Sequence, residues 1–304
     1  MTQRFTPGPT WPGSGINYGN DRAFSIYFDP IKITNELRFL RRYFTKLRVF
    51  IPHYGYGTTH SIVTNCLFII DQAVSVGFTE IIWGITCSEA TLSATTYNDY
   101  LTAATARAIV AKNHGVTTFV VGNEEEYHVD GSSLTRAQIE AHVRSDLYTA
   151  VKIAFTGTVS YNLPAGVLSD WLANGKGSLD TIGMNVYGNS EYDGAGFCRD
   201  VRNFYNAFGP SSYISEYGLH YDWTAVTMTP LNQYRELRKR HDFIKRIGLS
   251  SGYFFLYSHL SDDHFAVRLA NGQYRYMWQA LVSERFAWIG EPNTQIYTLR
   301  RVKQ

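Results

Sequence analysis

Short apolar runs and longer helical patterns alternate along the whole chain. The apolar runs are predicted as strands at Ile16–Tyr18, Leu47–Ile51, Glu80–Ile85, Thr117–Gly122, Ile153–Tyr161, Thr181–Tyr187, Tyr213–Tyr217 and Gly252–Tyr257. Several of them, such as EIIWGI and TFVVG, are continuously apolar, which is typical of strands that are buried on both faces. This alternation predicts a parallel sheet covered on its outside by helices.

A helical pattern follows most of these strands, with apolar residues three and four positions apart. Glycines are predicted to close four of the helices, at Gly77, Gly115, Gly209 and Gly248. Thr229 and Pro230 are predicted as the N-cap and first residue of another helix. Eight strand–helix units predict a single (β/α)8 TIM barrel domain over residues 1–304. A doubly wound open sheet is the rival, but the Gly13-Ser14-Gly15 segment precedes the first strand instead of following it.

Composition excludes several classes of protein. Of the 304 residues, 44% are apolar and 18% are charged, as in ordinary globular domains. A net charge of +2 gives no reason to expect nucleic acid or an anionic membrane as a partner. The three cysteines, Cys66, Cys87 and Cys198, have no metal-ligand spacing, and Cys66 and Cys198 are expected as free thiols in helices.

The sequence also bears on where the protein resides. No apolar run reaches the roughly 20 residues of a membrane helix, so a soluble protein is expected. The first residues lack the charged-then-apolar pattern of a signal peptide. The protein is therefore expected to be secreted if a leader was removed and cytoplasmic otherwise. The sequence gives no indication of its oligomeric state.

Two carboxylates stand where a barrel places its active site, at the carboxyl ends of the strands. The fourth predicted strand runs directly into Asn123-Glu124, and the seventh contains Glu216 within SEYG. Glycosidic cleavage needs such a pair, because one carboxyl group must be protonated to assist the leaving oxygen while the other is ionised. The aromatic share of 15% agrees with a sugar-binding cleft and equally with a large aromatic core.

The chain resembles the clan A glycoside hydrolases, the superfamily that contains many cellulases, mannanases, β-galactosidases and β-glucosidases. Besides the two glutamates, the resemblance rests on DTIGMNVY at Asp180–Tyr187, ISEYG at Ile214–Gly218 and the run Asp262–Trp278, which resembles the sequence that follows the clan's eighth strand. These motifs are short but span the whole chain, and they do not identify one family within the clan.

The resemblance implies a role for each matching residue. Glu216 would be the nucleophile and Glu124 the acid/base of a double displacement with retention at the anomeric carbon. Asn123 would bind the sugar 2-hydroxyl, Arg48 would orient the nucleophile, and Tyr187 would donate a hydrogen bond to it. The chemistry requires no cofactor and no metal.

Some positions depart from the clan's pattern. Asn185 points to the same side as Tyr187 and stands where many members have His. The acid/base is followed by two further glutamates in GNEEEYH, and strand alternation together with the preceding Asn favours Glu124 as the catalytic one. Tyr257 stands where the eighth strand often ends in a Trp sugar platform. Four further residues are expected to line the cleft on sequence position: Tyr18, His53, His220 and Trp223.

The predicted function is therefore a retaining hydrolase of β-linked poly- or oligosaccharides. Modest loop lengths favour an open groove and internal cleavage. A non-catalytic carbohydrate-binding barrel and a transglycosylase that uses the same two glutamates remain alternatives. A metal-dependent barrel hydrolase is disfavoured, because no His ligands stand at successive strand ends.

Overall fold

A computed structural model describes most of the chain. The described residues are 11–18, 28–49, 60–85, 97–127, 134–187, 194–219, 229–255, 267–268, 274–275, 277–282 and 296–297.

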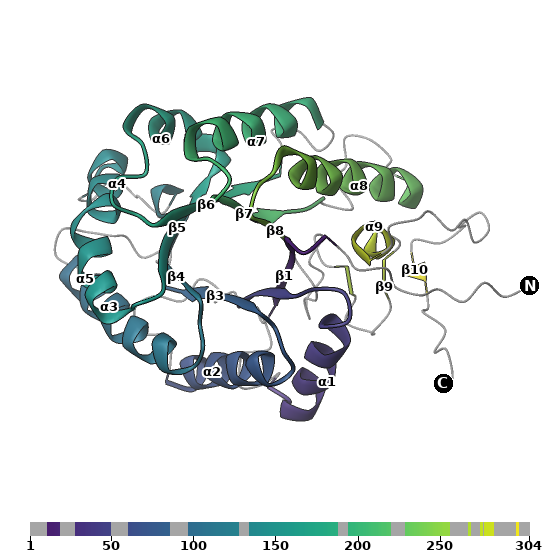
Figure 1. Ribbon diagram of the computed structural model, residues 1–304, viewed down its shortest axis with the longest axis horizontal. Coiled ribbons are helices and arrows are strands. Elements are labelled where there is room, and N and C mark those ends of the chain that lie inside the picture. The colour runs from purple at the N-terminus through teal and green to yellow at the C-terminus, as the bar shows by residue number, and fades with distance from the viewer. Residues whose placement is uncertain are drawn as a thin grey trace, which may run out of the picture.

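Eight parallel strands close into a barrel in the order of the sequence, and β1 pairs with β8 to complete the ring (Figure 1). The strands are β1 Ser14–Tyr18, β2 Lys46–Val49, β3 Glu80–Gly84, β4 Thr118–Asn123, β5 Thr158–Pro164, β6 Thr181–Val186, β7 Tyr213–Tyr217 and β8 Ser251–Phe254. The predicted (β/α)8 barrel is therefore confirmed, because consecutive parallel strands with helical crossovers have closed on themselves.

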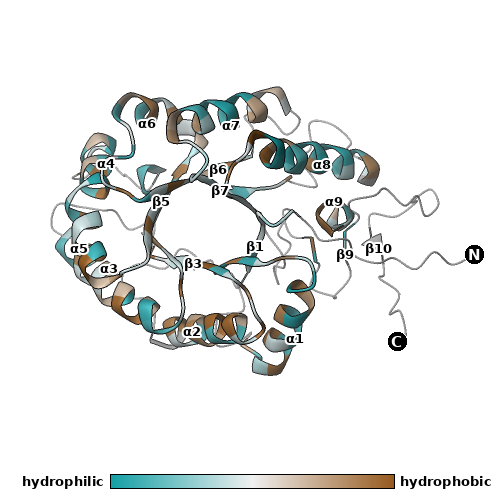
Figure 2. Ribbon diagram, in the orientation of Figure 1, coloured by the Kyte–Doolittle hydropathy of each residue, from teal (hydrophilic) through white to brown (hydrophobic). Residues whose placement is uncertain are grey.

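Helices surround the ring of strands (Figure 1). They are α1 Pro30–Leu40, α2 His60–Ser75, α3 Tyr97–Asn113, α4 Arg136–Arg144, α5 Asp146–Ala154, α6 Leu168–Asn174, α7 Gly194–Phe208 and α8 Pro230–Ile247. These helices carry both hydrophobic and hydrophilic residues (Figure 2), and their buried side chains pack on the outer faces of the strands. Short 3-10 turns follow β4 and β5, namely η1 Glu125–Tyr127 and η2 Ala165–Val167.

A small C-terminal element packs beside the barrel. Helix α9, Trp278–Val282, contacts α8, and the ring of Trp278 stacks on Phe39 of α1 with a centroid separation of 6.1 Å. The two-residue strands β9, Tyr274–Arg275, and β10, Ile296–Tyr297, pair antiparallel. Among the described helices, none is long and apolar enough to cross a bilayer.

The helix ends match their expected chemistry. Gly77, Gly115, Gly209 and Gly248 all adopt positive φ, between 76° and 94°, which lets each chain turn out of a helix at no steric cost. Thr229 accepts a hydrogen bond from the backbone N–H of Asn232 and caps α8, with Pro230 as its first residue.

The fifth strand was predicted incorrectly as Ile153–Tyr161. Helix α5 continues to Ala154, and the strand runs from Thr158 to Pro164. The β-branched Ile153 lies on the solvent side of the helix with 81% of its surface exposed, so its apolar character belongs to neither the strand nor the core. The later position of the strand matters for the site, because Asn162 becomes part of β5 and its side chain bonds to Asn123 in the barrel interior.

Strand alternation divides the barrel interior into layers. At the amino ends of the strands, Lys46 and Glu80 form an ion pair at 2.6 Å. Above them, Ile82, Val120, Tyr213 and Tyr253 form a small apolar cluster of their own. The carboxyl end of the interior is lined instead by buried polar side chains: Asn17, Arg48, Asn123, Asn162, Asn185, Ser215 and Glu216. Polar groups at this depth must bind one another or a ligand, because an unpaired buried polar group is costly.

The approach of β3 to β4 allows a test of the packing. A Cβ at Gly84 would lie 2.0 Å from the backbone oxygen of Val120, whereas a Cβ at Gly194 would meet only a side-chain oxygen at 3.6 Å. We expect Gly84→Ala to lower the free energy of unfolding by about 1–3 kcal/mol, the usual cost of overpacking, and Gly194→Ala to leave it nearly unchanged. Urea unfolding measures both, and equal stabilities would contradict the described strand spacing.

Candidate active site

Arg48 of β2 stands at the centre of the carboxyl end of the barrel. Its Nη1 donates to Glu216 Oε1 at 2.6 Å and to Asn17 Oδ1 at 2.8 Å, and its Nη2 donates to Asn123 Oδ1 at 2.7 Å. Only 3% of Arg48 and 5% of Glu216 is exposed to solvent. One guanidinium thus joins β1, β4 and β7, and it fixes the positions of three side chains at once.

Glu216 is held from two sides. Arg48 contacts one carboxylate oxygen, and the hydroxyl of Tyr187 donates to the other at 2.7 Å. The register of β7 shifts between Ile214 and Tyr217, so that the adjacent residues Ser215 and Glu216 both bond to groups inside the barrel. Burial raises the pKa of Tyr187 well above its ordinary value, and the charge of Glu216 raises it further, because ionised Tyr187 would face a second negative charge.

Asn123 is an acceptor for three neighbours. Its Oδ1 receives hydrogen bonds from Arg48, from Asn162 of β5 at 3.2 Å and from Asn185 of β6 at 3.2 Å. This arrangement fixes the orientation of the amide and leaves its NH2 group for a ligand, because no described residue accepts a hydrogen bond from it. Tyr213 donates to Asn162 at 2.8 Å and holds that side chain from below.

Glu124 follows Asn123 in a strained backbone conformation. Its φ is +58°, the sole positive value among the described non-glycine residues. Burial and then the charge of Glu216 raise the pKa of Glu124 to about 8, although a hydrogen bond from Asn185 and the charge of Arg48 act in the opposite direction. At neutral pH, Glu124 therefore carries a proton while it faces a second carboxyl group.

The two glutamates that follow Glu124 point elsewhere. Glu125 Oε1 accepts the backbone N–H of Asn123 at 2.9 Å, and Glu126 accepts Tyr161 Oη at 2.5 Å and Trp171 Nε1 at 2.8 Å. Both side chains lie outside the barrel wall and are 1% exposed. Of the three consecutive acids, only Glu124 joins the cluster around Arg48.

The structure brings six of the predicted site residues together: Glu124, Glu216, Asn123, Arg48, Tyr187 and Asn185. Tyr18 is not among them, because strand alternation turns it outward, where its hydroxyl donates to Glu36 of α1 at 2.7 Å. Four predicted residues lie outside the described segments: His53, His220, Trp223 and Tyr257.

Three further residues belong to the cluster and were not predicted. Asn17 donates to the backbone oxygens of Ser215 and Phe254, at 3.1 and 3.3 Å, and so ties β1 to β7 and β8. Ser215 donates to Asn185 Oδ1 at 2.6 Å, and Asn162 binds Asn123. A sequence signal existed for Asn17, which stands between two apolar residues of β1, and for Ser215, which directly precedes Glu216 in β7.

No group of three or more acidic, His or Cys side chains suited to a metal ion occurs within the described part of the chain. Cys66 is a free, buried thiol on α2, and Cys198 is free and partly buried on α7. Burial raises the pKa of the Cys66 thiol to about 12, so it is inert at neutral pH.

Comparisons with known proteins place the fold. No protein-family model and no curated protein matches the sequence. A β-1,4-mannanase of glycoside hydrolase family 113 is similar in structure, with a TM-score of 0.62 and 15% identity over 84% of this chain and 94% of the other. A glycoside hydrolase family 5 enzyme from Prevotella bryantii has a TM-score of 0.65 and 15% identity over 83% of this chain and 90% of the other. Xylanase 10B from Thermotoga maritima has a TM-score of 0.61 and 14% identity over 88% of this chain and 93% of the other. At this identity the likeness shows the shared barrel fold.

The raised pKa of Glu124 predicts a pH dependence of stability. The folded protein keeps a proton on Glu124 up to pH about 8, whereas the unfolded chain releases it near 4.5. The associated stability is therefore complete below pH 4.5 and is lost as the pH rises to about 8. A difference of one pKa unit corresponds to about 1.4 kcal/mol. We expect wild type to lose stability relative to Glu124→Gln across this interval in urea unfolding, and a constant difference would contradict the assignment.

The buried pair of Arg48 and Glu216 predicts a non-additive pair of variants. Arg48→Met leaves Glu216 buried without its cation, and we expect it to lower the free energy of unfolding by about 3–5 kcal/mol. Arg48→Met combined with Glu216→Gln removes the uncompensated charge, so the double variant should unfold at a higher urea concentration than Arg48→Met alone. Strictly additive losses would show that the two side chains do not interact.

Proposed function

We propose that the protein is a retaining β-glycoside hydrolase, with Glu216 as nucleophile and Glu124 as acid/base. The observation that carries this proposal is the unequal environment of two carboxyl groups at the carboxyl end of one barrel. Glu216 is bound by Arg48 and Tyr187, while the pKa of Glu124 is raised to about 8. One group is thus ready to attack and the other to donate a proton, as glycosidic cleavage requires.

In the first step, a Glu216 oxygen attacks the anomeric carbon of the sugar. The bond from that carbon to the leaving oxygen breaks, and the proton of Glu124 passes to the leaving oxygen. The product is a glycosyl ester on Glu216, an alcohol and an ionised Glu124. Arg48 and Tyr187 fix the direction of the attacking oxygen, so little reorganisation is needed at the moment of reaction.

In the second step, the roles of Glu124 reverse. Esterification removes the charge of Glu216, which is one of the causes that raise the pKa of Glu124. The pKa of Glu124 therefore falls once the ester forms, and its carboxylate can take a proton from water. That water attacks the anomeric carbon, the ester bond breaks, and Glu216 is restored as a carboxylate with net retention of configuration.

The surroundings of the pair support a sugar substrate. The NH2 group of Asn123 donates to no acceptor among the described residues, while its oxygen is held by Arg48. We assign this NH2 group to the hydroxyl next to the anomeric carbon. Similar structures include a β-1,4-mannanase and an endo-β-1,4-xylanase, which supports a β-linked polysaccharide cleaved internally.

Hydrolysis of β-linked polysaccharides and aryl β-glycosides tests the proposal. Glu124→Ala should reduce kcat/KM by about 10²- to 10⁴-fold on a substrate with a poor leaving group, the usual contribution of a general acid, and Glu216→Ala should reduce it at least as much. Asp170→Ala, which removes an exposed carboxylate on α6, is the control and should retain full activity.

Two further readings separate the alternatives. The NMR spectrum of the first product should show the β-anomer, because two successive displacements at the anomeric carbon give net retention. Products formed with an added acceptor sugar distinguish hydrolysis from transglycosylation. Binding of a polysaccharide without turnover would instead indicate a carbohydrate-binding barrel, and full activity of both glutamate variants would exclude this pair as the catalytic site.

A further inference from the structure

The backbone at Glu124 needs an explanation. A left-handed φ is strained for a non-glycine residue, and such strain persists only when the surrounding structure enforces it. The next two residues, Glu125 and Glu126, are acids buried outside the barrel wall, and burying them is costly unless their oxygens are hydrogen-bonded. Strain and buried charge are therefore adjacent in the sequence, immediately after β4.

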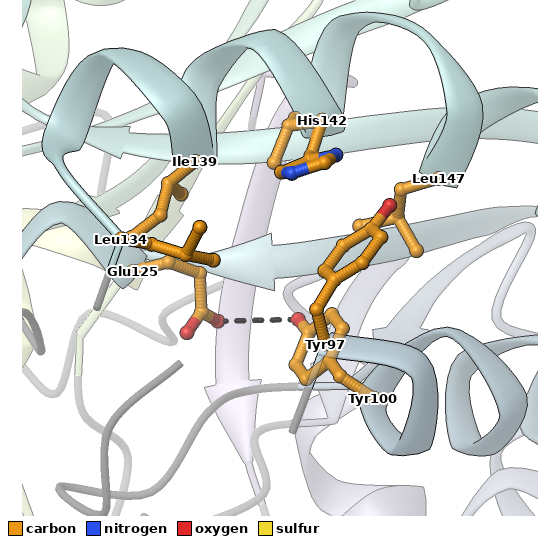
Figure 3. Close-up of a pocket in the computed structure, with 8 residues that line it drawn as sticks. Tyr97, Tyr100, Glu125, Leu134, Ile139, His142 and Leu147 are labelled. Atoms are coloured by element: carbon orange, nitrogen blue, oxygen red, sulfur yellow. Dashed lines mark hydrogen bonds between the residues drawn. The ribbon is translucent and has the colours of Figure 1, made fainter. Parts of the chain in front are cut away.

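Glu125 folds back onto the end of its own strand. Its Oε1 accepts the N–H of Asn123 at 2.9 Å and lies 3.4 Å from the hydroxyl of Tyr100 on α3. A Cβ at Gly122 would lie 2.8 Å from Glu125 Cγ, so glycine at this position leaves room for the folded-back side chain. Figure 3 shows the Glu125 carboxylate directed toward Tyr100 at the base of a small pocket between α3 and α4.

Glu126 is held by an aromatic pair on the neighbouring elements. Tyr161 of β5 and Trp171 of α6 stack with ring centroids 5.2 Å apart, and each donates a hydrogen bond to one oxygen of Glu126. Arg144 covers the outer face of Trp171 at 4.1 Å and pairs with Glu140. The hydroxyl of Tyr161 also accepts the N–H of Glu125 at 2.9 Å.

Four backbone amides of the turn have clear hydrogen-bond partners. The N–H of Asn123 bonds to the Glu125 carboxylate, that of Glu124 to the oxygen of Asn162, that of Glu125 to Tyr161, and that of Tyr127 to the oxygen of Glu124. Two of these four bonds end on groups that belong to the outer network of Glu125, Glu126 and Tyr161. Those bonds flank the strained residue on both sides.

We propose that Glu125, and Glu126 acting through Tyr161, are positioning residues that hold the backbone of Glu124 so that its carboxyl group faces Glu216. This inference rests on the proposed function for its catalytic consequence. Loss of the network lets the backbone relax to an ordinary φ and moves the acid/base away from Asn185 and Glu216. The nucleophile is held separately by Arg48 and Tyr187 and keeps its geometry.

The separation of the two networks determines the expected kinetics. A variant that misplaces only the acid/base should be impaired in the first step when the leaving group needs a proton. A dinitrophenyl β-glycoside, whose leaving group departs as a stable anion, should be cleaved in that step almost as fast as by wild type. A merely structural defect lowers the rate on both substrates equally.

The variants Glu125→Ala and Tyr161→Phe each remove one of the two bonds that flank Glu124. We expect each to reduce the rate of single-turnover cleavage of a phenyl β-glycoside by about 10- to 100-fold, because part of the rate enhancement by the general acid is lost. The rate on the dinitrophenyl β-glycoside should fall by less than about 3-fold. Glu125→Gln retains an acceptor oxygen for the Asn123 N–H and should restore most of the loss.

Glu36→Ala is the matched control. Glu36 is also a buried glutamate that accepts a tyrosine hydroxyl, but it lies on α1 and pairs with Arg268. It should cost comparable stability without any dependence on the leaving group. Equal losses on both glycosides for Glu125→Ala and Tyr161→Phe, or a Glu125→Gln variant as impaired as Glu125→Ala, would overturn the proposal.

A second measurement needs no substrate and therefore separates this inference from the proposed function. Carbon-13 NMR of labelled carboxyl groups follows the titration of Glu124, whose charged and titratable neighbours are Glu216, Arg48, Glu126, Tyr127 and Tyr187. In Glu125→Ala and Tyr161→Phe, the pKa should fall from about 8 toward its ordinary value, because the carboxyl group leaves Glu216 and gains solvent. It should not change in Glu36→Ala.

The outcomes are distinct. A wild-type protein that cleaves no glycoside while its Glu124 titration responds to Glu125→Ala and Tyr161→Phe supports the positioning role and overturns the proposed hydrolase activity. A titration that is the same in wild type and in both variants overturns the positioning role, whatever the activity of the protein.

Discussion

The buried guanidinium of Arg48 is the interaction on which the rest of the site depends. Within the described segments it is the one cation in contact with Glu216, and it also holds the amide oxygen of Asn123. A carboxylate at this depth would be strongly destabilised without a cation and further hydrogen bonds. Other inward-facing polar residues of the barrel, such as Asn17 and Ser215, complete the hydrogen-bond network around Arg48 and Glu216. This network stabilises the ion pair in a low-dielectric interior.

The same constraint makes two neighbouring carboxyl groups different. Glu216 accepts hydrogen bonds directly from the Arg48 guanidinium and the Tyr187 hydroxyl. The pKa of Glu124 is instead raised mainly by burial and by the negative charge of Glu216. The proposed mechanism requires this difference, because a pair of equivalent carboxylates could not divide the tasks of attack and protonation. The strained turn after β4 belongs to this arrangement, because it is what places Glu124 opposite Glu216 and turns Glu125 and Glu126 to the other side of the wall.

Much of the fold could be read from residue patterns, since seven predicted strands overlap their observed counterparts closely and the glycine-closed helix ends are confirmed. The fifth strand could not. The apolar run that contains Ile153 is shared between the end of one helix and the following turn, and periodicity over so few residues does not distinguish the two. Asn162 was missed for the same reason, because it lay beyond the predicted strand.

The sequence by itself determined the barrel and the positions of Glu124, Glu216, Arg48 and Tyr187 at strand ends, because strand alternation and the convergence of parallel strands are local rules. Tertiary structure decided the features that such local rules cannot predict, namely side-chain direction, contact partners and protonation. Register shifts in β4 and β7 set which neighbouring residues face inward, and helix α1 gives Tyr18 a partner outside the barrel. Protonation of Glu124 depends on burial and on charges from distant parts of the chain, which exist only once the barrel has closed.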